Sequence, residues 1–249
     1  MIYELKDTAK VKDLFAGWEE TLIYSCLQGV MGKIYVTDSV DPHSACIFVG
    51  CFAFYAGIPD RELLEYKLAD FTILVPYDND WQAFIEKCYP DARKTVRYAI
   101  KKDTHFNIVK LKALEKLLPD GYEMQKIDGS LYDECLKEPF TADFVSSFEN
   151  KQAFLKNGLG FVIVKDNKIV AGASSYSRYR EGIEIEVDTA KDERRKNLAT
   201  AVCAHLIIEC LDIGLYPSWD AQTPISVHLA EKLGYEFSHE YVVYELECN

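Results

Sequence analysis

The stretch that decides the fold runs from residue 182 to residue 214 and reads GIEIEVDTAKDERRKNLATAVCAHLIIECLDIG. Near its start, apolar Ile183, Ile185 and Val187 alternate with acidic residues. Alternation with a period of two predicts a strand with one buried face. A short polar loop follows, and then a long apolar segment that is typical of a buried helix. The stretch therefore predicts a strand, a tight loop and a helix in direct succession.

The loop between this strand and this helix carries a basic triplet, Arg194, Arg195 and Lys196, followed by Asn197. The first N–H groups of a helix have no partner within the helix and lie at the positive end of its dipole, so the position suits a phosphate group. Basic side chains beside it can add charge-assisted hydrogen bonds. We interpret the loop as an anion site, and the alternative is a solvated basic turn.

The charge balance favours a local anion over nucleic acid as the partner of this loop. The formal net charge is −12, and residues 121–249 carry 13 Lys and Arg against 22 Asp and Glu, a net of −9. So acidic a chain is not expected to bind nucleic acid. A compact basic triplet in an acidic half is better suited to one small anionic group.

Composition indicates a globular protein of the cytoplasm. With 49% hydrophobic and 13% aromatic residues the chain can build a sizeable core. It contains no run of 18 uncharged apolar residues and its first residues lack a secretory pattern, so we expect no membrane association. The eight cysteines form no CxxC pair and are interpreted as reduced core thiols. His43 and His105 show no ligand-like spacing to cysteine, so we expect no metal.

The organisation of the chain indicates two parts. A turn at residues 119–121 (PDG) divides a smaller N-terminal α/β domain, 1–119, from a second domain, 120–249. Periodicity in the second domain predicts the order β-α-α-β-β-β-α-β-α-β, with a hairpin turn at Asp166 and Asn167. We predict an α/β (α+β) fold with a mixed, mostly antiparallel sheet flanked by helices. The same patterns predict helices over residues 8–28 and 141–157 and strands over residues 45–55 and 217–221.

The element order and the loop together resemble the GNAT superfamily of acyl-CoA-dependent N-acyltransferases. The family motif is Arg/Gln-x-x-Gly-x-Gly/Ala, and residues 194–199 read RRKNLA, with Asn197 in place of the central glycine. Asn is the non-glycine residue that best tolerates positive φ. Residues 219–235 are similar to the family's strand and helix ending in Lys-Leu-Gly-aromatic, with Thr223 where Asn is usual. The resemblance covers about residues 121–247, and the whole chain looks like the branch in which a degenerate N-terminal half precedes one functional domain.

The resemblance implies acetyl-CoA as cosubstrate. It implies that the backbone of the strand pairs with the amides of the pantetheine arm, while the loop and helix start bind the pyrophosphate. No metal is implied, and a homodimer is left open. The residues expected to bind the cosubstrate are Val187, Asp188, Thr189, Arg194, Arg195, Lys196, Asn197, Leu198, Ala199, Thr200 and Ser226.

Acyl transfer to an amine needs a proton acceptor, because only the neutral amine attacks. For a lysine-like amine, pH 7 is ~3.4 units below the pKa, so deprotonation costs roughly 4.6 kcal/mol. A carboxylate can take this proton directly or through water. Glu186 is the first choice because it lies nearer the thioester end of the strand, and Glu184 is the second. The alternative is that both acids face solvent or pair with Arg178 or Arg180.

The proton donor for the leaving thiolate is not evident. Many family members use a tyrosine six residues after the usual Asn, and the matching position here is Leu229. Ser226, His228 and Tyr235 lie nearby, and coenzyme A can also leave as the thiolate. Two functions remain open at this point: an N-acetyltransferase of a small amine, and an acyl-CoA-binding pseudoenzyme or sensory module.

Three further expectations concern the fold around the strand and the acceptor. The strand that ends at Asp188 should separate from the strand around Trp219, which leaves a slot for the pantetheine arm. The helix is apolar nearly all round, so Ile208 and Leu211 should be buried by residues outside the C-terminal core. The acids at 184, 186 and 188 share one face, which predicts a small cationic amine as acceptor.

Overall fold

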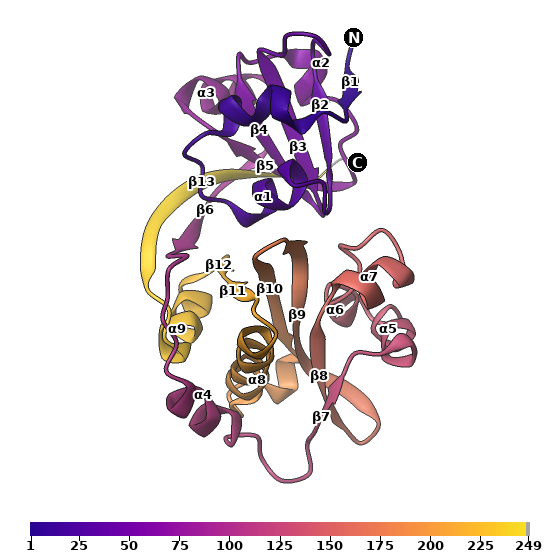
Figure 1. Ribbon diagram of the computed structural model, residues 1–249, viewed down its shortest axis with the longest axis vertical. Helices are drawn as coiled ribbons and strands as arrows, with labels where there is room; N and C mark the ends of the chain where they lie inside the picture. Colours follow the sequence, from indigo (N-terminus) through magenta and orange to yellow (C-terminus); the bar gives the residue numbers. More distant parts are fainter. Residues whose placement is uncertain (248–249) are drawn as a thin grey trace. The chain divides into compact units, whose positions relative to one another are not determined.

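The computed structural model describes residues 1–247 and divides into two compact units. The N-terminal unit comprises residues 1–97 together with the end of the chain from Glu240, and the C-terminal unit comprises residues 98–239 (Figure 1). The units therefore divide at Arg97 and Tyr98 instead of at 119/120. The reason is that the chain after β6 packs its next helix, α4 (Ile108–Glu115), against the C-terminal unit.

The N-terminal unit is built on one mixed sheet. Its strands follow the order β1-β2-β3-β4-β5-β13, in which only β4 and β5 are parallel. Its own core lies around Trp81, Tyr55 and Leu74, all fully buried. Its elements are β1 (Tyr3–Leu5), η1 (Thr8–Phe15), α1 (Thr21–Leu27), β2 (Lys33–Val36), β3 (Ser44–Val49), β4 (Phe52–Gly57), α2 (Arg61–Leu64), β5 (Phe71–Pro76), α3 (Asn79–Cys88) and the first part of β6 (Arg93–Ile100).

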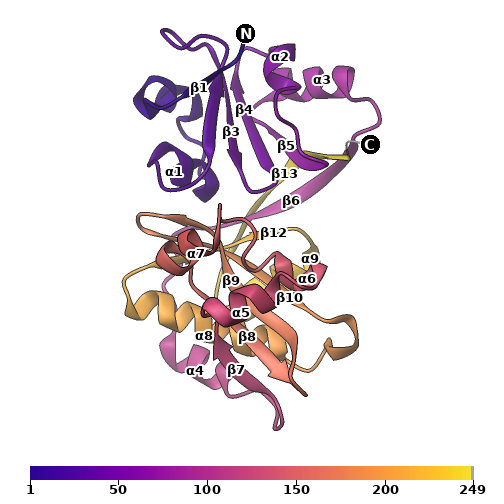
Figure 2. The ribbon, with the colours of Figure 1, turned by 90° about the vertical axis from the view of Figure 1, so that its right-hand side faces the viewer.

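The C-terminal unit is a second sheet with helices on both faces. Its strand order is β11-β10-β9-β8-β7, antiparallel throughout except for the β10–β11 pair. Helix α8 covers one face, and α5 to α7 lie on the other (Figure 2). After α4 its elements are β7 (Glu123–Lys126), α5 (Gly129–Cys135), α6 (Pro139–Ala142), α7 (Lys151–Asn157), β8 (Gly160–Lys165), β9 (Lys168–Tyr179), β10 (Gly182–Thr189), η2 (Lys191–Glu193), α8 (Leu198–Asp212), β11 (Tyr216–Ser218), β12 (Asp220–Ala221), α9 (Pro224–Leu233) and the start of β13 (Phe237–Glu247).

The two units repeat one order of elements and exchange their last strands. Leaving α4 aside, each runs through a strand, helical segments, three strands, a helix, a strand, a helix and a final strand. The N-terminal unit has two helical segments after its first strand and the C-terminal unit has three, and the single strand β5 corresponds to the two short strands β11 and β12. The first pattern ends in β6, whose end pairs with β12 in the C-terminal unit. The second ends in β13, whose end pairs with β5 in the N-terminal unit. The mixed, mostly antiparallel sheet flanked by helices is confirmed.

Four predicted segments are broken in the structure. The helix predicted over 8–28 is interrupted at Gly17, which has φ of +79°, and the strand over 45–55 turns at Gly50, with φ of +58°. The helix over 141–157 is two short helices, because Asn150 caps a new start by accepting the N–H of Ala153. The strand over 217–221 is split between two sheets. Turn and cap residues inside apolar segments decided the first three breaks.

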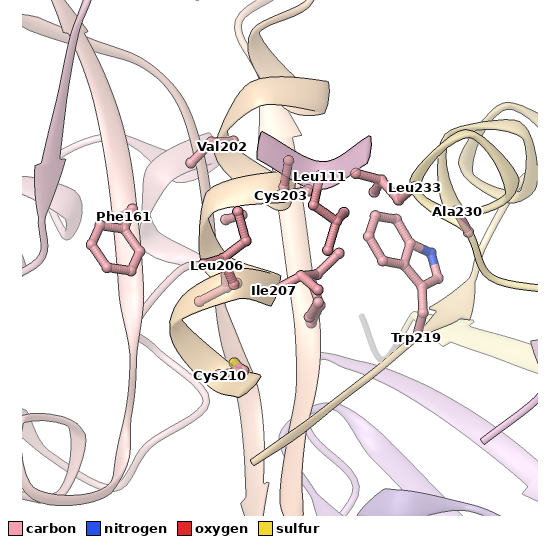
Figure 3. Packing of buried hydrophobic residues seen from close by; sticks show 14 of the residues in the cluster. Leu111, Phe161, Val202, Cys203, Leu206, Ile207, Cys210, Trp219, Ala230 and Leu233 are labelled. Carbon is pink, nitrogen blue, oxygen red and sulfur yellow. The ribbon is translucent and has the colours of Figure 1, made fainter. Parts of the chain in front are cut away.

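The longest helix, α8, is the centre of the C-terminal core (Figure 3). Its buried side chains pack against the sheet, against α9 and against Leu111 of α4. Ile208 is 8% exposed and Leu211 is half-buried, as expected of a helix that needs cover on more than one side. The burial of Ile208 and Leu211 is confirmed. The expected cover from outside the C-terminal core is not, because α4 precedes residue 120 but belongs to the C-terminal unit. No helix within residues 1–247 combines the length and apolar character needed to span a membrane.

Candidate functional site

The strand β10 loses its neighbour on one side halfway along its length. Its first residues, Gly182 to Glu184, pair with β11 in parallel, and the pair of Glu184 with Ser218 is the last. The next strand, β12, pairs with β6 instead. On its other edge β10 stays paired with β9 up to Thr189. The predicted separation of the two strands is confirmed, and it leaves the second half of β10 with an open edge.

The open edge presents the N–H groups of Val187 and Thr189. The Ala190 N–H bonds to Val170 on β9, and N–H directions alternate along a strand, so the odd-numbered donors point away from β9. The Glu186 carboxylate accepts from the Val187 N–H at 3.1 Å, and the Asp188 carboxylate accepts from the Thr189 N–H at 2.7 Å. The two N–H groups expected to meet pantetheine amides therefore lie at the open edge, where short local bonds satisfy them.

The loop after β10 contains two non-glycine residues with left-handed backbone. Arg195 has φ of +65° and Asn197 has φ of +62°. Asn197 thus adopts the conformation that the motif's glycine would supply, as the sequence predicted. Its side chain does not cap α8, although Asn or Asp side chains cap the helices α4, α5 and α7 in the same unit. The N–H groups of Leu198, Ala199 and Thr200 therefore begin the helix without a side-chain cap from Asn197.

The three basic residues of the loop have different roles. The Arg194 guanidinium donates to the Thr189 carbonyl at 3.1 Å and lies 3.5 Å from the Asp188 carboxylate. The Lys196 ammonium pairs with Glu193 at 2.7 Å. Arg195 is exposed, and within residues 1–247 it takes part in no ion pair. Of the triplet, Arg195 is the residue whose charge is available to an incoming anion.

Glu193 fixes the loop to the edge of the sheet, a role that the sequence analysis missed. This buried carboxylate accepts from the Tyr122 hydroxyl on the β7 side and from Lys165 of β8 at 3.2 Å, in addition to Lys196. The hydrogen bonds from Lys196 and then Tyr122 lower the pKa of Glu193 to about 2. The only local signal in the sequence was the spacing of Glu193 and Lys196, three residues apart.

Lys232 is the second residue that sequence reasoning missed. It lies in the last turn of α9, and its ammonium reaches the start of α8. There it donates to the Asn197 side-chain oxygen at 3.2 Å and to the Thr200 hydroxyl at 3.1 Å. The structure therefore adds a cation from a separate helix to the loop.

The candidate bases lie on either side of the point where β10 and β11 separate. Glu184 is the last residue paired with β11 and is buried, whereas Glu186 is two residues further along, at the open edge and half-buried. Asp143, which follows α6, is a further acid on this face. Burial first, and then the charge of Asp188, raise the pKa of Asp143. The face therefore carries four acids, one more than the sequence analysis named.

The side chains considered as proton donors occupy distinct environments. The Tyr235 hydroxyl donates to the Pro217 carbonyl and is buried, and this burial raises its pKa well above the usual value. His228 is exposed. The Ser226 oxygen accepts from the Trp219 indole N–H at 3.1 Å, which leaves its own hydrogen available. Leu229 packs against the core and has no proton to give. Among residues 1–247 no group of three His, Cys, Asp or Glu side chains is arranged to hold a metal ion.

The N-terminal unit lacks the features of this site. Its parallel strands β4 and β5 stay paired from Phe52 with Ile73 to Tyr55 with Pro76, and the Tyr77 N–H continues the ladder to the Tyr55 carbonyl. The helix after β4 has only four residues. Both units repeat the order of elements. Within the described residues, only the C-terminal unit combines that order with a separated strand pair and a long helix.

Known proteins resemble the chain along almost its full length. Residues 12–244 match the family described as GNAT acetyltransferase. The chain is 25% identical over 246 residues to the uncharacterized N-acetyltransferase YdfB of Bacillus subtilis (strain 168), covering 90% of this chain and 89% of that protein. It is 47% identical to a solved GCN5-related N-acetyltransferase-like protein from Streptococcus suis, with a TM-score of 0.92 and coverage of 96% and 98%. It shares its fold at 11% identity with a tandem GNAT protein from the clavulanic acid biosynthesis pathway, with a TM-score of 0.53 and coverage of 99% and 98%. The chain belongs to the GNAT acetyltransferase family.

Proposed function

We propose that this protein is an N-acetyltransferase that moves an acetyl group from acetyl-CoA to a small cationic amine, and that the C-terminal unit alone carries the site. One observation carries the proposal: β10 separates from β11 after Glu184, and its open second half leads into the loop that begins α8. The open edge supplies N–H donors for a linear amide-containing arm, and the loop supplies donors and charge for its phosphates.

The donor lies along β10 with its pyrophosphate at residues 194–200. The N–H groups of Val187 and Thr189 pair with pantetheine amides and replace the local bonds to Glu186 and Asp188. Arg195 contributes a free guanidinium, while Arg194 and Lys196 hold the loop through Thr189 and Glu193. Ser226, which accepts a hydrogen bond from Trp219 on the other side of the separation, is a further proposed contact of the donor.

Glu186 is the general base in this proposal. It lies on the open edge beyond the last β10–β11 pair, where the thioester and the amine meet. When a pantetheine amide takes the Val187 N–H, the Glu186 carboxylate loses that hydrogen bond and can accept a proton from the amine. Glu184 is the alternative base. The Ser226 hydroxyl, whose hydrogen is not used in the bond from Trp219, is the proposed hydrogen-bond donor to the leaving thiolate.

A cationic acceptor follows from the acids on the face that carries Glu186. Asp188 and Asp143 lie close enough for the first charge to raise the pKa of the second. Such a face attracts cations and repels anionic metabolites. The test compares cationic with anionic amines at two ionic strengths. Added salt should raise KM for cationic acceptors selectively, and an equal response of both classes would contradict this substrate class.

Two measurements test the function itself. Calorimetric titration with acetyl-CoA tests the binding site, and release of free coenzyme A in the presence of a panel of amines tests turnover. We expect binding without any amine, and release of thiol that depends on the amine. Absence of acetyl-CoA binding would overturn the proposal.

The second candidate is an acyl-CoA-binding module without turnover. Leu229, at the position of the family's usual tyrosine, packs against the core and cannot protonate the leaving group. Binding of acetyl-CoA with no turnover across the amine panel would favour this function.

A further inference from the structure

A hydrogen bond that crosses β10 closes the paired end of β10 and β11. The Tyr179 hydroxyl of β9 and the Ser218 hydroxyl of β11 lie 2.9 Å apart, although β9 and β11 lie on opposite edges of β10. The ring of Tyr179 passes over Gly182, where a Cβ would lie 2.5 Å from the phenol oxygen. Ser218 is also the partner of Glu184 in the last pair before the strands separate. This bond, which we term the hydroxyl bridge, therefore fixes the point at which the separation begins.

The hydroxyl bridge belongs to a buried polar row on one face of the sheet. Glu184 pairs with Ser177 of β9 and with Ser218 of β11, so the three side chains lie side by side. Ile183 and Ile185 belong to the core cluster of α8, and alternation directs the row to the opposite face. Within residues 1–247, the Ser177 hydroxyl has no hydrogen-bond partner although Ser177 is fully buried. Buried hydroxyls are rarely unsatisfied, so this one indicates a ligand that brings a polar group to the row.

The bridge is held firmly at neutral pH. Burial raises the pKa of Tyr179 to about 12, the hydrogen bond with Ser218 opposes this rise, and the charge of Glu184 adds to it. The phenol therefore stays protonated. A second buried tyrosine, Tyr235, donates to the carbonyl of Pro217, the residue before Ser218. Two tyrosine hydroxyls thus hold β11 at its last pairs with β10, so the closed end resists displacement.

The length of the open half of β10 determines which part of an acyl-CoA meets the row. In the proposed function the pyrophosphate binds at residues 194–200 and the pantetheine arm follows β10. Residues 185–189 span roughly 16 Å as extended backbone. The arm is about as long as four extended residues, roughly 14 Å. The thioester therefore reaches the closed end, and its acyl group lies against the polar row.

We propose that the hydroxyl bridge between Tyr179 and Ser218 determines acyl-chain length, so that the site accepts acetyl-CoA and rejects donors with longer alkyl chains. This inference rests on the proposed function and adds the residues that select its donor. A longer chain must displace the bridge and leave two buried hydroxyls without partners, which is unfavourable. A thioester carbonyl or an acceptor amine can satisfy the hydroxyl of Ser177, whereas a further methylene group cannot.

The test compares kcat/KM for acetyl-, propionyl- and butyryl-CoA with one amine, and Kd for the same donors by calorimetry. In the wild type kcat/KM should fall about 100-fold or more from acetyl-CoA to butyryl-CoA, since a single methylene changes it by about tenfold or more. Tyr179→Phe and Ser218→Ala each remove one hydroxyl of the bridge and make the closed end apolar. Each should reduce the preference for acetyl-CoA about tenfold, mainly by improving butyryl-CoA.

Two variants serve as controls. Ser218→Thr keeps the hydroxyl and should keep the preference of the wild type. Tyr77→Phe removes a hydroxyl that donates to the Ala16 carbonyl at 3.1 Å in the N-terminal unit, so it should also leave the preference unchanged. The ratio between donors is the decisive measurement, because a general structural defect lowers kcat/KM for all three donors alike.

Three outcomes would overturn the inference while the proposed function stands. The first is equal use of acetyl- and butyryl-CoA by the wild type. The second is an unchanged preference in both Tyr179→Phe and Ser218→Ala. The third is a loss of activity in these variants that is the same for every donor, which assigns the bridge a structural role only. If the wild type binds none of the three donors, the proposed function fails and this inference fails with it.

Discussion

Removing the charge of Arg195 should weaken acetyl-CoA binding and leave the stability of the fold almost unchanged. Arg195 is exposed and is in no ion pair among residues 1–247, so Arg195→Gln should change the free energy of unfolding by no more than about 0.5 kcal/mol. A lost hydrogen bond from a charged group to a phosphate costs about 1.5–3 kcal/mol, which corresponds to roughly 10- to 150-fold in Kd. The left-handed backbone at this position is kept, because Gln and Arg have similar tolerance for it.

The assay is calorimetric titration with acetyl-CoA at low and high salt, paired with urea unfolding. Wild-type affinity should fall as salt rises, and Arg195→Gln should reduce that dependence. Lys191→Gln is the matched control, because Lys191 is an exposed cation of the same loop without an ion pair in the described residues. Lys196→Gln should instead lower the urea midpoint, because it removes a partner of buried Glu193. Equal affinities of wild type and Arg195→Gln would refute this assignment of the loop charges.

Three further changes test the site and the core. Glu186→Gln should lower kcat by about 10²- to 10⁴-fold with unchanged acetyl-CoA affinity; full activity would transfer the role to Glu184. Glu193 has a pKa of about 2 against an ordinary 4.5, so its stabilising contribution is complete above pH 4.5 and is lost as the pH falls towards 2. The stability difference between wild type and Glu193→Gln should therefore be constant from pH 8 to about pH 5 and shrink below it, and a constant difference down to pH 3 would contradict the lowered pKa. Leu206 is fully buried on α8, so Leu206→Ala should reduce the free energy of unfolding by about 2–5 kcal/mol in urea titrations, and a loss under 1 kcal/mol would contradict the packing of α8.

The local sequence determined the elements that hold the site. Alternation at residues 183–187 predicted β10, and the apolar segment after Asn197 predicted α8, because side-chain periodicity reflects which face of an element is buried. The hairpin at Asp166 and Asn167 was predicted for the same local reason, and both residues have positive φ. The tolerance of Asn197 for left-handed backbone was also evident from its residue type.

Contacts between distant parts of the chain could not be predicted in this way. The bonds of Glu193 to Tyr122 and Lys165, and of Lys232 to Asn197, join residues that are 28 to 71 positions apart. No periodicity or spacing records which surface side chains meet across a fold. The apolar character of α8 predicted that some element would cover it, but it could not predict that this element is α4. An apolar face indicates burial and does not identify the residues that bury it.

The exchange of last strands is the clearest case of a feature decided by tertiary structure alone. The sequences of β6 and β13 predict strands, and the sheet edge that each one joins depends on which edge is left unpaired in the folded units. The same holds for the separation of β10 from β11, which arises because β12 pairs with β6. The sequence by itself determined the strand, the loop and the helix, because local sterics and side-chain burial act within a few residues. Only the tertiary structure decided where the strands separate and which distant cations and acids meet the loop, because pairing and charge act between residues that folding alone brings together.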